Sequence, residues 1–547
     1  MKIKYLRSRY TALLFLILCI SKIEAQVNAS DSLALVDLYN NTNGTGWKNS
    51  TNWLTAKPVS KWYGVTVTGN RVTSVSLTFN KLSGQLPASV GNLSELTDLE
   101  LYNNNLQGSL NTVIKLTKLL TLDLSSNAFT GNIPGQLSQL SQLKTLSLSN
   151  NKLTGSIPAS ICTIKPLQKL YLGNNQLSGS IPKNIDSLVF LGFLNLSYNH
   201  LSGDLPPGFY QLYGLVTAQL QNNQFSGKLL NRFGNFPKMI TLMLNDNQFS
   251  GSIPGTFGQL GNLANLYLQN NHLSGAIPSL LGYCAGLIEL NISNNQLKGT
   301  LPLSLINLTR LSAFDVSGNR LSGELPTQII TMPSLLSLKA SDNHLTFTKN
   351  INNTDSTNLN STDLSNNDFN FNGLEYIASN VPKPIYAPQA QITIHQHGAV
   401  LSVYVGGRLS NNTYTWHLIN GNTTVLSADS IFTPSQPGSY YVTVTNKVAA
   451  KLTLISDTVT VASANTVDVA PLSIAPNPVL NILNIHGLNA TVNSNITISD
   501  LKGDIVLNAS SYKHSTFKLD VSKLQPGSYI ININDGAALK TIHFIKE

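Results

Sequence analysis

The chain has 547 residues, of which only 11% are charged, well below the ~25% of an ordinary soluble domain. The formal net charge is +9, yet the sequence is rich in neutral amides and hydroxyls and lacks a basic stripe, which argues against a nucleic-acid partner. Three cysteines are too few for a disulfide framework, and we expect Cys162 and Cys284 to be small buried apolar residues.

Residues 1–25 have the composition of a cleaved secretory signal. Lys2 and Lys4 precede an apolar run over residues 12–20, and the small residue Ala25 follows. The run is too short to span a bilayer, and no later stretch is apolar enough to do so. We therefore expect export, and no transmembrane segment in the mature chain.

Residues 26–71 are expected to cap the region that follows. The stretch DSLALVDLYNN is typical of a helix, with Asp31 as its N-cap. Trp47, Trp53 and Trp62 come next, and no tryptophan occurs in the long repetitive region behind them. We interpret these three rings as an apolar plug over the first coil.

From residue 72 the sequence repeats itself. VSLTFNKLSGQLP, LDLSSNAFTGNIP and LNISNNQLKGTLP are copies of one pattern, and successive copies are 24 residues apart except for one step of 23. Such a period indicates a solenoid, in which each coil buries its apolar side against its neighbours. The thirteen copies are marked by the asparagine ladder Asn80, Asn104, Asn127, Asn151, Asn175, Asn199, Asn223, Asn247, Asn271, Asn295, Asn319, Asn343 and Asn367.

The ladder asparagines are interpreted as structural. Apolar residues eight, five and three positions before each one indicate a short strand with one buried face. A buried amide must find hydrogen-bond partners, and a turning backbone provides them. FNGLEYIASN at 371–380 is expected to supply a short closing helix before the period ends at Pro382.

The repeat pattern LxxLxLxxNxLxGxIP resembles the plant-type leucine-rich repeat family over about residues 72–370. The resemblance implies a mainly β fold in which residues 72–382 form a curved right-handed solenoid with its parallel sheet on the concave side. Residues 26–71 resemble the N-terminal cap of secreted members of this family, without the paired cysteines of the plant versions.

The concave face carries the candidate ligand site. Residues six, four and two positions before each ladder asparagine point away from the core. On repeats five to ten, aromatic rings and a methionine lie beside amides there, which favours contact with a protein or a glycan. Scattered exposed apolar residues are also ordinary in solenoids, and the pattern alone does not decide. The candidate residues are Lys169, Tyr171, Phe193, Asn195, Gln219, Met243, Tyr267, Gln269 and Asn291.

Residues 383–463 lose the period and alternate as short predicted strands. Trp416 on one strand and Tyr440 at the start of another resemble the core tryptophan and corner tyrosine of an immunoglobulin-like β-sandwich. Val403 and Val442 stand where antibody domains have cysteines, so we expect this sandwich to hold by packing alone.

Residues 464–547 are expected to form a second, small β-sandwich. PNP at 476–478, DLKG at 500–503 and LQPGSY at 524–529 precede a last strand that bears lysines. This order resembles the C-terminal sorting domain of the type IX secretion system of Bacteroidetes-type bacteria. The resemblance implies that the type IX machinery is a partner, and that the chain is then released or attached to the cell surface. A β-sandwich without a sorting role is the alternative.

Signatures of common enzymes do not occur in the sequence, which has no GxSxG, HExxH or GxxxxGK[ST]. The arrangement most like an active site is Asp98, Glu100 and Asp123. Glu100 and Asp123 are expected about 5 Å apart on adjacent strands, as in a retaining glycosidase, but nothing in the sequence encloses them. We expect no enzyme activity, no cofactor and no metal.

The sequence predicts a secreted or cell-surface recognition protein that binds an extracellular protein or glycan. Adhesion is the leading hypothesis, and it rests on architecture. The alternatives are a glycan-capture module that assists surface polysaccharide degradation and a glycosidase that acts through the acidic cluster.

Overall fold

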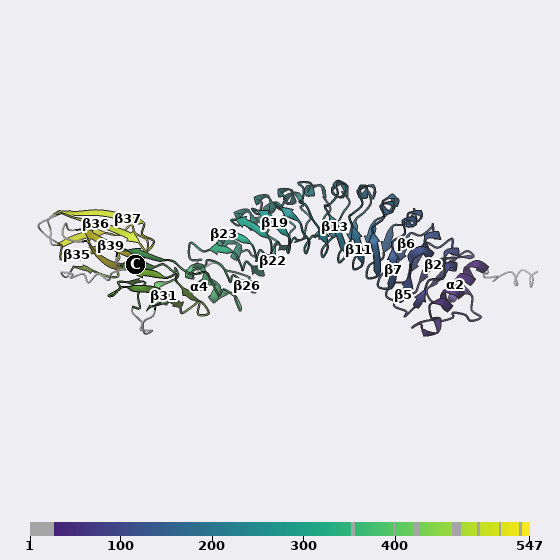
Figure 1. Cartoon of the computed structure of the whole chain (residues 1–547), viewed down its shortest axis with the longest axis horizontal. Helices are drawn as coiled ribbons and strands as arrows, with labels where there is room; N and C mark the ends of the chain where they lie inside the picture. The colour runs from purple at the N-terminus through teal and green to yellow at the C-terminus, as the bar shows by residue number, and fades with distance from the viewer. Residues whose placement is uncertain are drawn as a thin grey trace, which may run out of the picture. The chain divides into compact units, whose positions relative to one another are not determined.

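The computed structural model describes residues 27–351, 356–398, 400–419, 427–461, 472–488, 493–512, 516–534 and 539–547 (Figure 1). The expected signal at 1–25 lies outside these residues. The chain divides into two compact units, one up to Leu297 and one from Lys298 onward.

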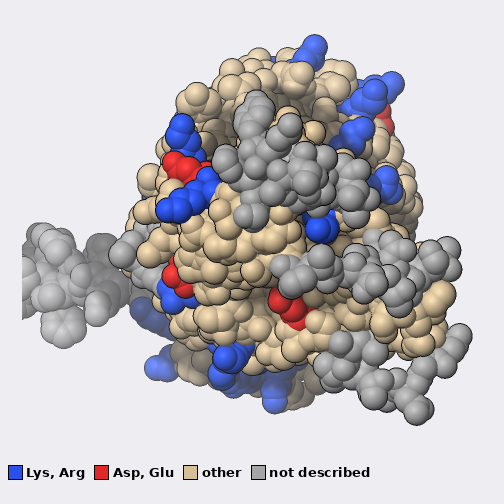
Figure 2. Space-filling view, turned by 90° about the vertical axis from the view of Figure 1, so that its left-hand side faces the viewer, with Lys and Arg blue, Asp and Glu red and all other residues tan. Residues whose placement is uncertain are grey.

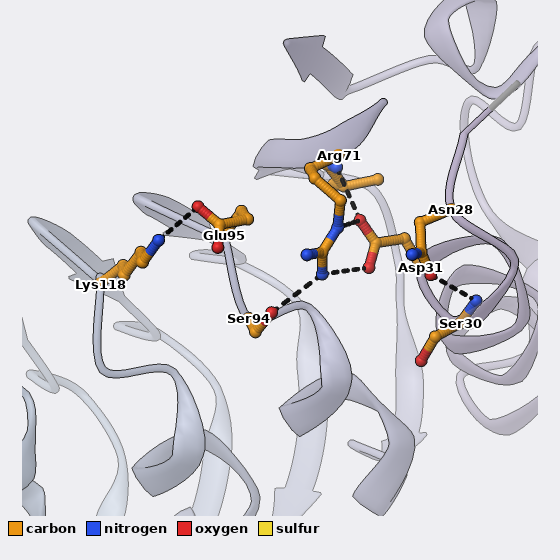
Figure 3. A network of polar contacts seen from close by, with 8 residues as sticks. Asn28, Ser30, Asp31, Arg71, Ser94, Glu95 and Lys118 are labelled. Carbon is orange, nitrogen blue, oxygen red and sulfur yellow. Dashed lines mark hydrogen bonds and ion pairs between the residues drawn. The ribbon is translucent and has the colours of Figure 1, made fainter. Parts of the chain in front are cut away.

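The N-terminal cap begins with helix α2 (Ala29–Asn41), and its N-cap differs from the prediction. Asn28 is the N-cap, and its side chain accepts a hydrogen bond from the backbone N–H of Ser30 (2.9 Å). Asp31 lies in the first turn and is fully buried, because Arg71 binds both of its carboxylate oxygens at 2.9 and 2.8 Å (Figure 3). The Val72 N–H donates to the same carboxylate (2.8 Å). A carboxylate engaged by a guanidinium forty residues away is not available to cap the helix.

The three tryptophans of the cap are buried, and the half-buried Tyr39 ring packs against Trp47 and Trp53. The Trp53 ring centroid lies 4.8 Å from both the Trp47 and the Trp62 centroids. Each indole N–H donates to a backbone carbonyl, those of Thr42, Tyr63 and Lys57. The plug is therefore apolar in its body and hydrogen-bonded at each polar atom, as buried tryptophans require. Two short 3₁₀ helices complete the cap, η1 (Gly44–Gly46) and η2 (Val59–Lys61).

The repeats form one long sheet of 14 strands within the described residues, which confirms the predicted fold class. β1 (Val65–Thr68) is antiparallel to β2 (Arg71–Ser76), and each later strand of the sheet pairs in parallel with the equivalent strand of the next coil. Figure 1 follows the stack by colour from α2 in purple to β19 in teal. The remaining strands of the first unit in this sheet are β4 (Asp98–Glu100), β6 (Thr121–Asp123), β8 (Thr145–Ser147), β10 (Lys169–Tyr171), β12 (Phe193–Asn195), β14 (Thr217–Gln219), β16 (Thr241–Met243), β18 (Asn265–Tyr267) and β20 (Glu289–Asn291).

A second line of short parallel strands follows the ladder asparagines, and 3₁₀ helices lead back toward the next coil. The glycine of each LxG has positive φ, for example 74° at Gly155, a conformation that glycine adopts without steric cost. The strands are β3 (Ser83–Gln85), β5 (Asn105–Gly108), β7 (Ala128–Asn132), β9 (Lys152–Ser156), β11 (Gln176–Gly179), β13 (His200–Gly203), β15 (Gln224–Phe225), β17 (Ser250–Gly251), β19 (His272–Gly275) and β21 (Gln296–Gly299). The 3₁₀ helices are η3 (Ala88–Asn92), η4 (Leu110–Lys115), η5 (Gly135–Gln139), η6 (Ala159–Thr163), η7 (Ile185–Ser187), η8 (Pro207–Gln211), η9 (Phe233–Asn235), η10 (Gly255–Gln259), η11 (Ser279–Tyr283) and η12 (Leu303–Asn307).

The ladder asparagines join each coil to the one before it. The Asn175 amide donates to the carbonyls of Leu148 (3.0 Å) and Leu172 (3.1 Å), and its Oδ1 accepts from the Leu153 N–H (3.0 Å). Asn80 instead bonds to Asn49 of the cap. The Asn175 pattern recurs at Asn104, Asn127, Asn151, Asn199, Asn223, Asn247, Asn271, Asn295, Asn343 and Asn367.

The second unit continues the repeats and then closes them. Helix α4 (Phe371–Asn380) forms where a closing helix was predicted, with a non-helical bend at Asn372 and Gly373. A Cβ at Gly373 would lie 2.6 Å from the Phe347 ring, so this bend needs glycine. The other elements of this part are β22 (Ala313–Asp315), β23 (Arg320–Glu324), α3 (Thr327–Ile330), β24 (Ser337–Lys339), β25 (His344–Thr346) and β26 (Ser361–Asp363).

Two small antiparallel sheets follow α4. Trp416 is fully buried between them and donates to the Asp429 carbonyl (2.8 Å), while the Tyr440 hydroxyl donates to the Gln436 carbonyl (2.6 Å). Val403 and Val442 are also fully buried. One sheet has the order β27-β28-β30, and the other β29-β31-β32 with β33 on β31. Their bounds are β27 (Ile394–His397), β28 (Val400–Val403), β29 (Asn412–Leu418), β30 (Ile431–Phe432), β31 (Gly438–Asn446), β32 (Thr453–Ile455) and β33 (Val459–Val461), with η13 (Leu409–Asn411) before β29.

The C-terminal strands form two more antiparallel sheets around an apolar core that includes Ile498, Ile531 and Phe544. The sheet orders are β34-β35-β38 and β37-β36-β39-β40. The strands are β34 (Ser473–Ala475), β35 (Ile482–His486), β36 (Asn493–Asp500), β37 (Ile505–Tyr512), β38 (Thr516–Asp520), β39 (Gly527–Asn534) and β40 (Leu539–Lys546).

Candidate functional site

The outward face of the long sheet carries two continuous rows of side chains, which we call the concave rows. Each three-residue strand buries its middle residue and directs the other two away from the core, as in β12 and β18. Parallel pairing without a shift then aligns equivalent residues of successive strands. Between β10 and β20 the first row is Lys169, Phe193, Thr217, Thr241, Asn265 and Glu289, and the second is Tyr171, Asn195, Gln219, Met243, Tyr267 and Asn291.

Eight of the nine predicted residues lie in these two rows, and Gln269 follows two residues after β18. The Lys169 ammonium lies 5.7 Å from the centroid of the Phe193 ring, within the range of a cation–π contact. The Tyr267 hydroxyl donates to the Glu289 carboxylate across neighbouring strands. Glu289 is not among the nine predicted residues. Its register partner is Asn265, so its contact with Tyr267 runs diagonally between the two strands and appears only in the structure.

Side-chain amides and the Met243 sulfur lie between the Lys169–Phe193 contact and the Tyr267–Glu289 contact. The Gln219 amide points to the Met243 sulfur at 3.9 Å. The Asn195 Oδ1 accepts from the Ser197 hydroxyl (2.7 Å) and is therefore partly occupied. Among the described residues, the buried Oε1 atoms of Gln221 and Gln269 have no hydrogen-bond partner. A buried acceptor without a partner is costly to the fold.

The two tyrosines of the second row act as neutral hydrogen-bond donors. Burial, and then the neighbouring Glu289 carboxylate, raise the pKa of Tyr267 to about 12. Burial also raises the pKa of Tyr171. Both groups stay protonated at neutral pH, so this part of the face offers two rings and the Tyr171 hydroxyl rather than phenolate charge, while the Tyr267 hydroxyl hydrogen is engaged by Glu289.

Comparison with known families agrees with this geometry. Residues 117–177 match the leucine-rich repeat family, as do residues 190–212, 238–260, 262–284 and 286–308. Residues 473–547 match the family described as the secretion system C-terminal sorting domain. The chain carries leucine-rich repeats and a sorting tail.

Curated relatives resemble parts of the repeats. The chain is 37% identical over 97 residues to phytosulfokine receptor 1, and 34% identical over 79 residues to receptor-like kinase TMK4, both from Arabidopsis thaliana. These segments are 17% and 14% of this chain, and 9% and 8% of the relatives. The chain thus spans less than a tenth of the length of either receptor.

Solved plant receptors share the repeat fold. The peptide hormone receptor RGFR1 in complex with RGF2 has a TM-score of 0.52 and 28% identity, covering 59% of this chain and 52% of the receptor. The Arabidopsis receptor kinase HAESA, in complex with the peptide hormone IDA and the co-receptor SERK1, has a TM-score of 0.55 and 26% identity, covering 67% of this chain and 66% of that chain.

The acidic cluster of the first leucine-rich repeats is held by its own neighbours. Glu100 and Asp123 are register partners on β4 and β6, as predicted from their spacing. Asp123 accepts from the N–H and hydroxyl of Ser125 at 2.9 and 2.6 Å, and Glu100 accepts from the Ser76 hydroxyl (3.0 Å). Asp98 accepts from the Thr97 hydroxyl (2.7 Å). Each of the three carboxylates therefore already accepts a hydrogen bond from a neighbouring hydroxyl group. All three lie on an open face of the sheet.

A cavity of about 660 Å³ lies in the second unit, and none of the nine predicted residues lines it. Tyr404, Arg408, Lys502 and Tyr529 are among its lining residues. Lysines and arginines are scattered among uncharged side chains on the face that Figure 2 shows. Among the described residues, no group of three or more His, Cys, Asp or Glu side chains is placed to hold a metal ion, and no helix is long and apolar enough to cross a membrane.

Proposed function

We propose that this protein is an exported recognition protein whose concave rows, from β10 to β20, bind an extended peptide or an exposed protein segment. The carrying observation is the pairing of Tyr267 with Glu289 at one end of the rows and of Lys169 with Phe193 at the other. The two ends are five strands apart, about 24 Å at ordinary strand spacing. The likeness to receptors solved with peptide hormones supports a ligand of this class.

A peptide fits the distribution of charge better than a neutral polymer does. Lys169 and Glu289 have opposite charges at the two ends, and amides, a ring and a methionine lie between them. A peptide with an acidic residue or its carboxyl terminus near Lys169, and a basic group near Glu289, would complement both. Alternating side chains of an extended peptide would then reach the amides between.

We propose four folded parts, with the cap at 26–71, the solenoid at 72–382, an immunoglobulin-like sandwich at 383–463 and the sorting domain at 464–547. The match of residues 473–547 to sorting domains supports export by the type IX route. The chain then acts outside the cell, either released or attached to the surface, with adhesion to a neighbouring cell or polymer as its role.

Removal of the two tyrosines of the second row tests the proposal. We expect the full chain with Tyr171→Ala and Tyr267→Ala to lose at least about tenfold in affinity for peptides selected from a random display library, since buried aromatic contacts commonly contribute ~1–2 kcal/mol or more each. Binding is measured by surface plasmon resonance with the selected peptides. The matched control is Tyr213→Ala, because this tyrosine is 56% exposed and lies outside the concave rows.

Two results would contradict a peptide site on the concave rows. One is equal peptide affinity in the double variant and in the wild-type chain. The other is retention of oligosaccharides, but of no peptide, by the wild-type chain. Hydrolysis of a glycoside that Glu100→Gln abolishes would instead establish the glycosidase alternative.

A further inference from the structure

We infer that a second ligand site lies along one edge of the first unit and takes an uncharged, hydroxyl-rich glycan chain. Its residues directly precede the ladder asparagines, and we call them the outer row. They are Ser126, Asn150, Asn174, Tyr198, Asn222, Asp246, Asn270 and Asn294. None of them belongs to the concave rows, so the inference goes beyond the proposed function.

Tyr198 is an unusual residue for the backbone conformation that the outer row adopts. All eight residues have φ between 51° and 57°, in the left-handed region. Asn, Asp and Gly enter this region most readily, and an aromatic residue there is a steric outlier. Six of the eight are Asn or Asp, and the exceptions are Ser126 and Tyr198. Phe79, at the equivalent position before Asn80, has φ 52° as well, but its ring packs edge-on against Tyr102 at 5.0 Å, whereas Tyr198 has no such partner among the described residues. Placing tyrosine at this position costs the fold stability relative to asparagine.

Packing does not compensate for this cost. The Tyr198 side chain is 55% exposed. Within the described part of the chain, its ring has no aromatic partner and its hydroxyl has no hydrogen bond, while its backbone N–H donates to the Gln221 carbonyl (3.0 Å). A strained residue whose ring is half exposed and has neither an aromatic nor a hydrogen-bond partner among the described residues is a candidate for contact with a ligand.

The side chains on either side of Tyr198 are aligned by bonds between coils. The Asn174 amide donates to Asn150 (2.7 Å), and the Asn150 amide donates to the Ser126 hydroxyl (3.4 Å). Beyond Tyr198, Asn294 donates to Asn270 (2.9 Å), and Asn270 donates to Asp246 (2.6 Å). Each amide has two donor hydrogens and two acceptor lone pairs, and these bonds use no more than two of the four. The row therefore presents spare donors and acceptors at regular intervals of about 4.8 Å.

The hydrogen-bonding groups that remain free along this edge suit a sugar better than a peptide backbone. The backbone N–H groups of Asn150 and Asn174 already donate to the neighbouring coil at 2.9 and 2.8 Å, so a peptide strand cannot add there. What remains is side-chain amides and one exposed ring. Sugar hydroxyls both donate and accept, and the C–H face of a pyranose packs on an aromatic ring. Asp246 is the one charged member of the eight, which disfavours an anionic polymer.

Glycan binding by the full chain tests this inference. The probes are cellulose and chitin in pull-downs, and laminarin and yeast mannan in calorimetry, with polygalacturonate as the anionic comparison. We expect binding to at least one neutral glycan, and about tenfold weaker binding by Tyr198→Asn. The thermal midpoint of this variant should stay equal or rise, because asparagine suits the left-handed backbone. Asn174→Gly, which keeps the backbone freedom but removes the amide, should weaken binding about threefold or more.

The control Tyr213→Asn removes an equally exposed ring elsewhere on the first unit and should bind as the wild-type chain does. The concave variant Tyr171→Ala with Tyr267→Ala should also keep glycan binding, which separates this site from the peptide site. The inference is overturned if the wild-type chain retains none of the four neutral glycans, if Tyr198→Asn binds unchanged, or if Tyr213→Asn loses as much. Stronger retention on polygalacturonate would overturn it as well.

Discussion

Asn175 illustrates how one amide joins two coils. Its two donor hydrogens and its oxygen all have backbone partners, and these partners belong to its own coil and to the preceding one. The side chain is 8% exposed, so water cannot replace these partners. Its function is to satisfy a buried turn of backbone, and the neighbouring Asn174 carries the exposed amide instead.

We expect Asn175→Ala to lower the free energy of unfolding by about 1–3 kcal/mol, because it leaves the buried Leu153 N–H without its acceptor and removes one of the two amide donors at each of the Leu148 and Leu172 carbonyls. Urea unfolding followed by circular dichroism measures the change. The exposed neighbour substitution Gln176→Ala is the control and should change stability by less than ~0.5 kcal/mol. An unchanged urea midpoint for Asn175→Ala would show that the ladder bonds contribute nothing to stability.

Helix α4 is the element that ties the repeats to the two small sheets that follow it. A single oxygen of Glu375 accepts from the Arg408 N–H (3.0 Å) and from the side-chain amides of Asn411 (3.1 Å) and Asn446 (2.7 Å). The Phe371 N–H donates to the Val405 carbonyl (2.7 Å) beside it. The segments around these two sheets are therefore attached to the closing helix by several hydrogen bonds.

Glu375→Ala should destabilise this junction by about 2 kcal/mol, since hydrogen bonds to a charged acceptor contribute more than neutral ones. Glu375→Gln keeps an acceptor oxygen in place and should cost less than about half as much. Limited proteolysis of the segment between α4 and β27 reports the loosening, with faster cleavage expected only in the alanine variant. Equal cleavage of both variants and the wild-type chain would contradict a role for Glu375 in the junction.

Periodicity explains why the elements of the repeats were predictable. From Asn104 onward, each ladder asparagine marks a strand four to six residues earlier, and the closing helix begins at Phe371, directly after the last repeat. The N-cap was not predictable in the same way, because Arg71 engages Asp31 across forty residues and leaves Asn28 to cap α2. Tyr198 had a visible signal, an aromatic residue where most copies have Asn or Asp, but its meaning depends on a backbone angle.

At the scale of the whole molecule, the concave rows and the segment that matches sorting domains occupy separate parts of the chain. The concave rows lie in the first unit, whereas residues 473–547 match sorting domains. This separation means that binding and export can be removed independently.

The N-terminal cap is anchored to the first coils by the Asp31–Arg71 ion pair. Arg71 also donates a hydrogen bond to the Ser94 hydroxyl (2.9 Å) (Figure 3).

Truncation tests the division. In a bacterium with the type IX system, a chain that lacks residues 473–547 should accumulate in the periplasm, while its peptide affinity stays within about twofold of the full chain. Fractionation with immunoblotting measures the location. A chain that lacks residues 383–463 but keeps the tail is the control and should still leave the cell. Wild-type levels of the tail-less chain in the medium would contradict a sorting role.

The placement of the four tryptophans has a spectroscopic consequence. Trp47, Trp53 and Trp62 are buried in the cap, and Trp416 is buried between the sheets after α4, with none in the repeats. Indole fluorescence therefore reports on the two flanking structures and is blind to the coils between them, whose melting appears in circular dichroism. Replacing Trp416 by phenylalanine would leave an emission signal from the cap alone, so that fraying of the first coils could be followed separately from the rest of the chain.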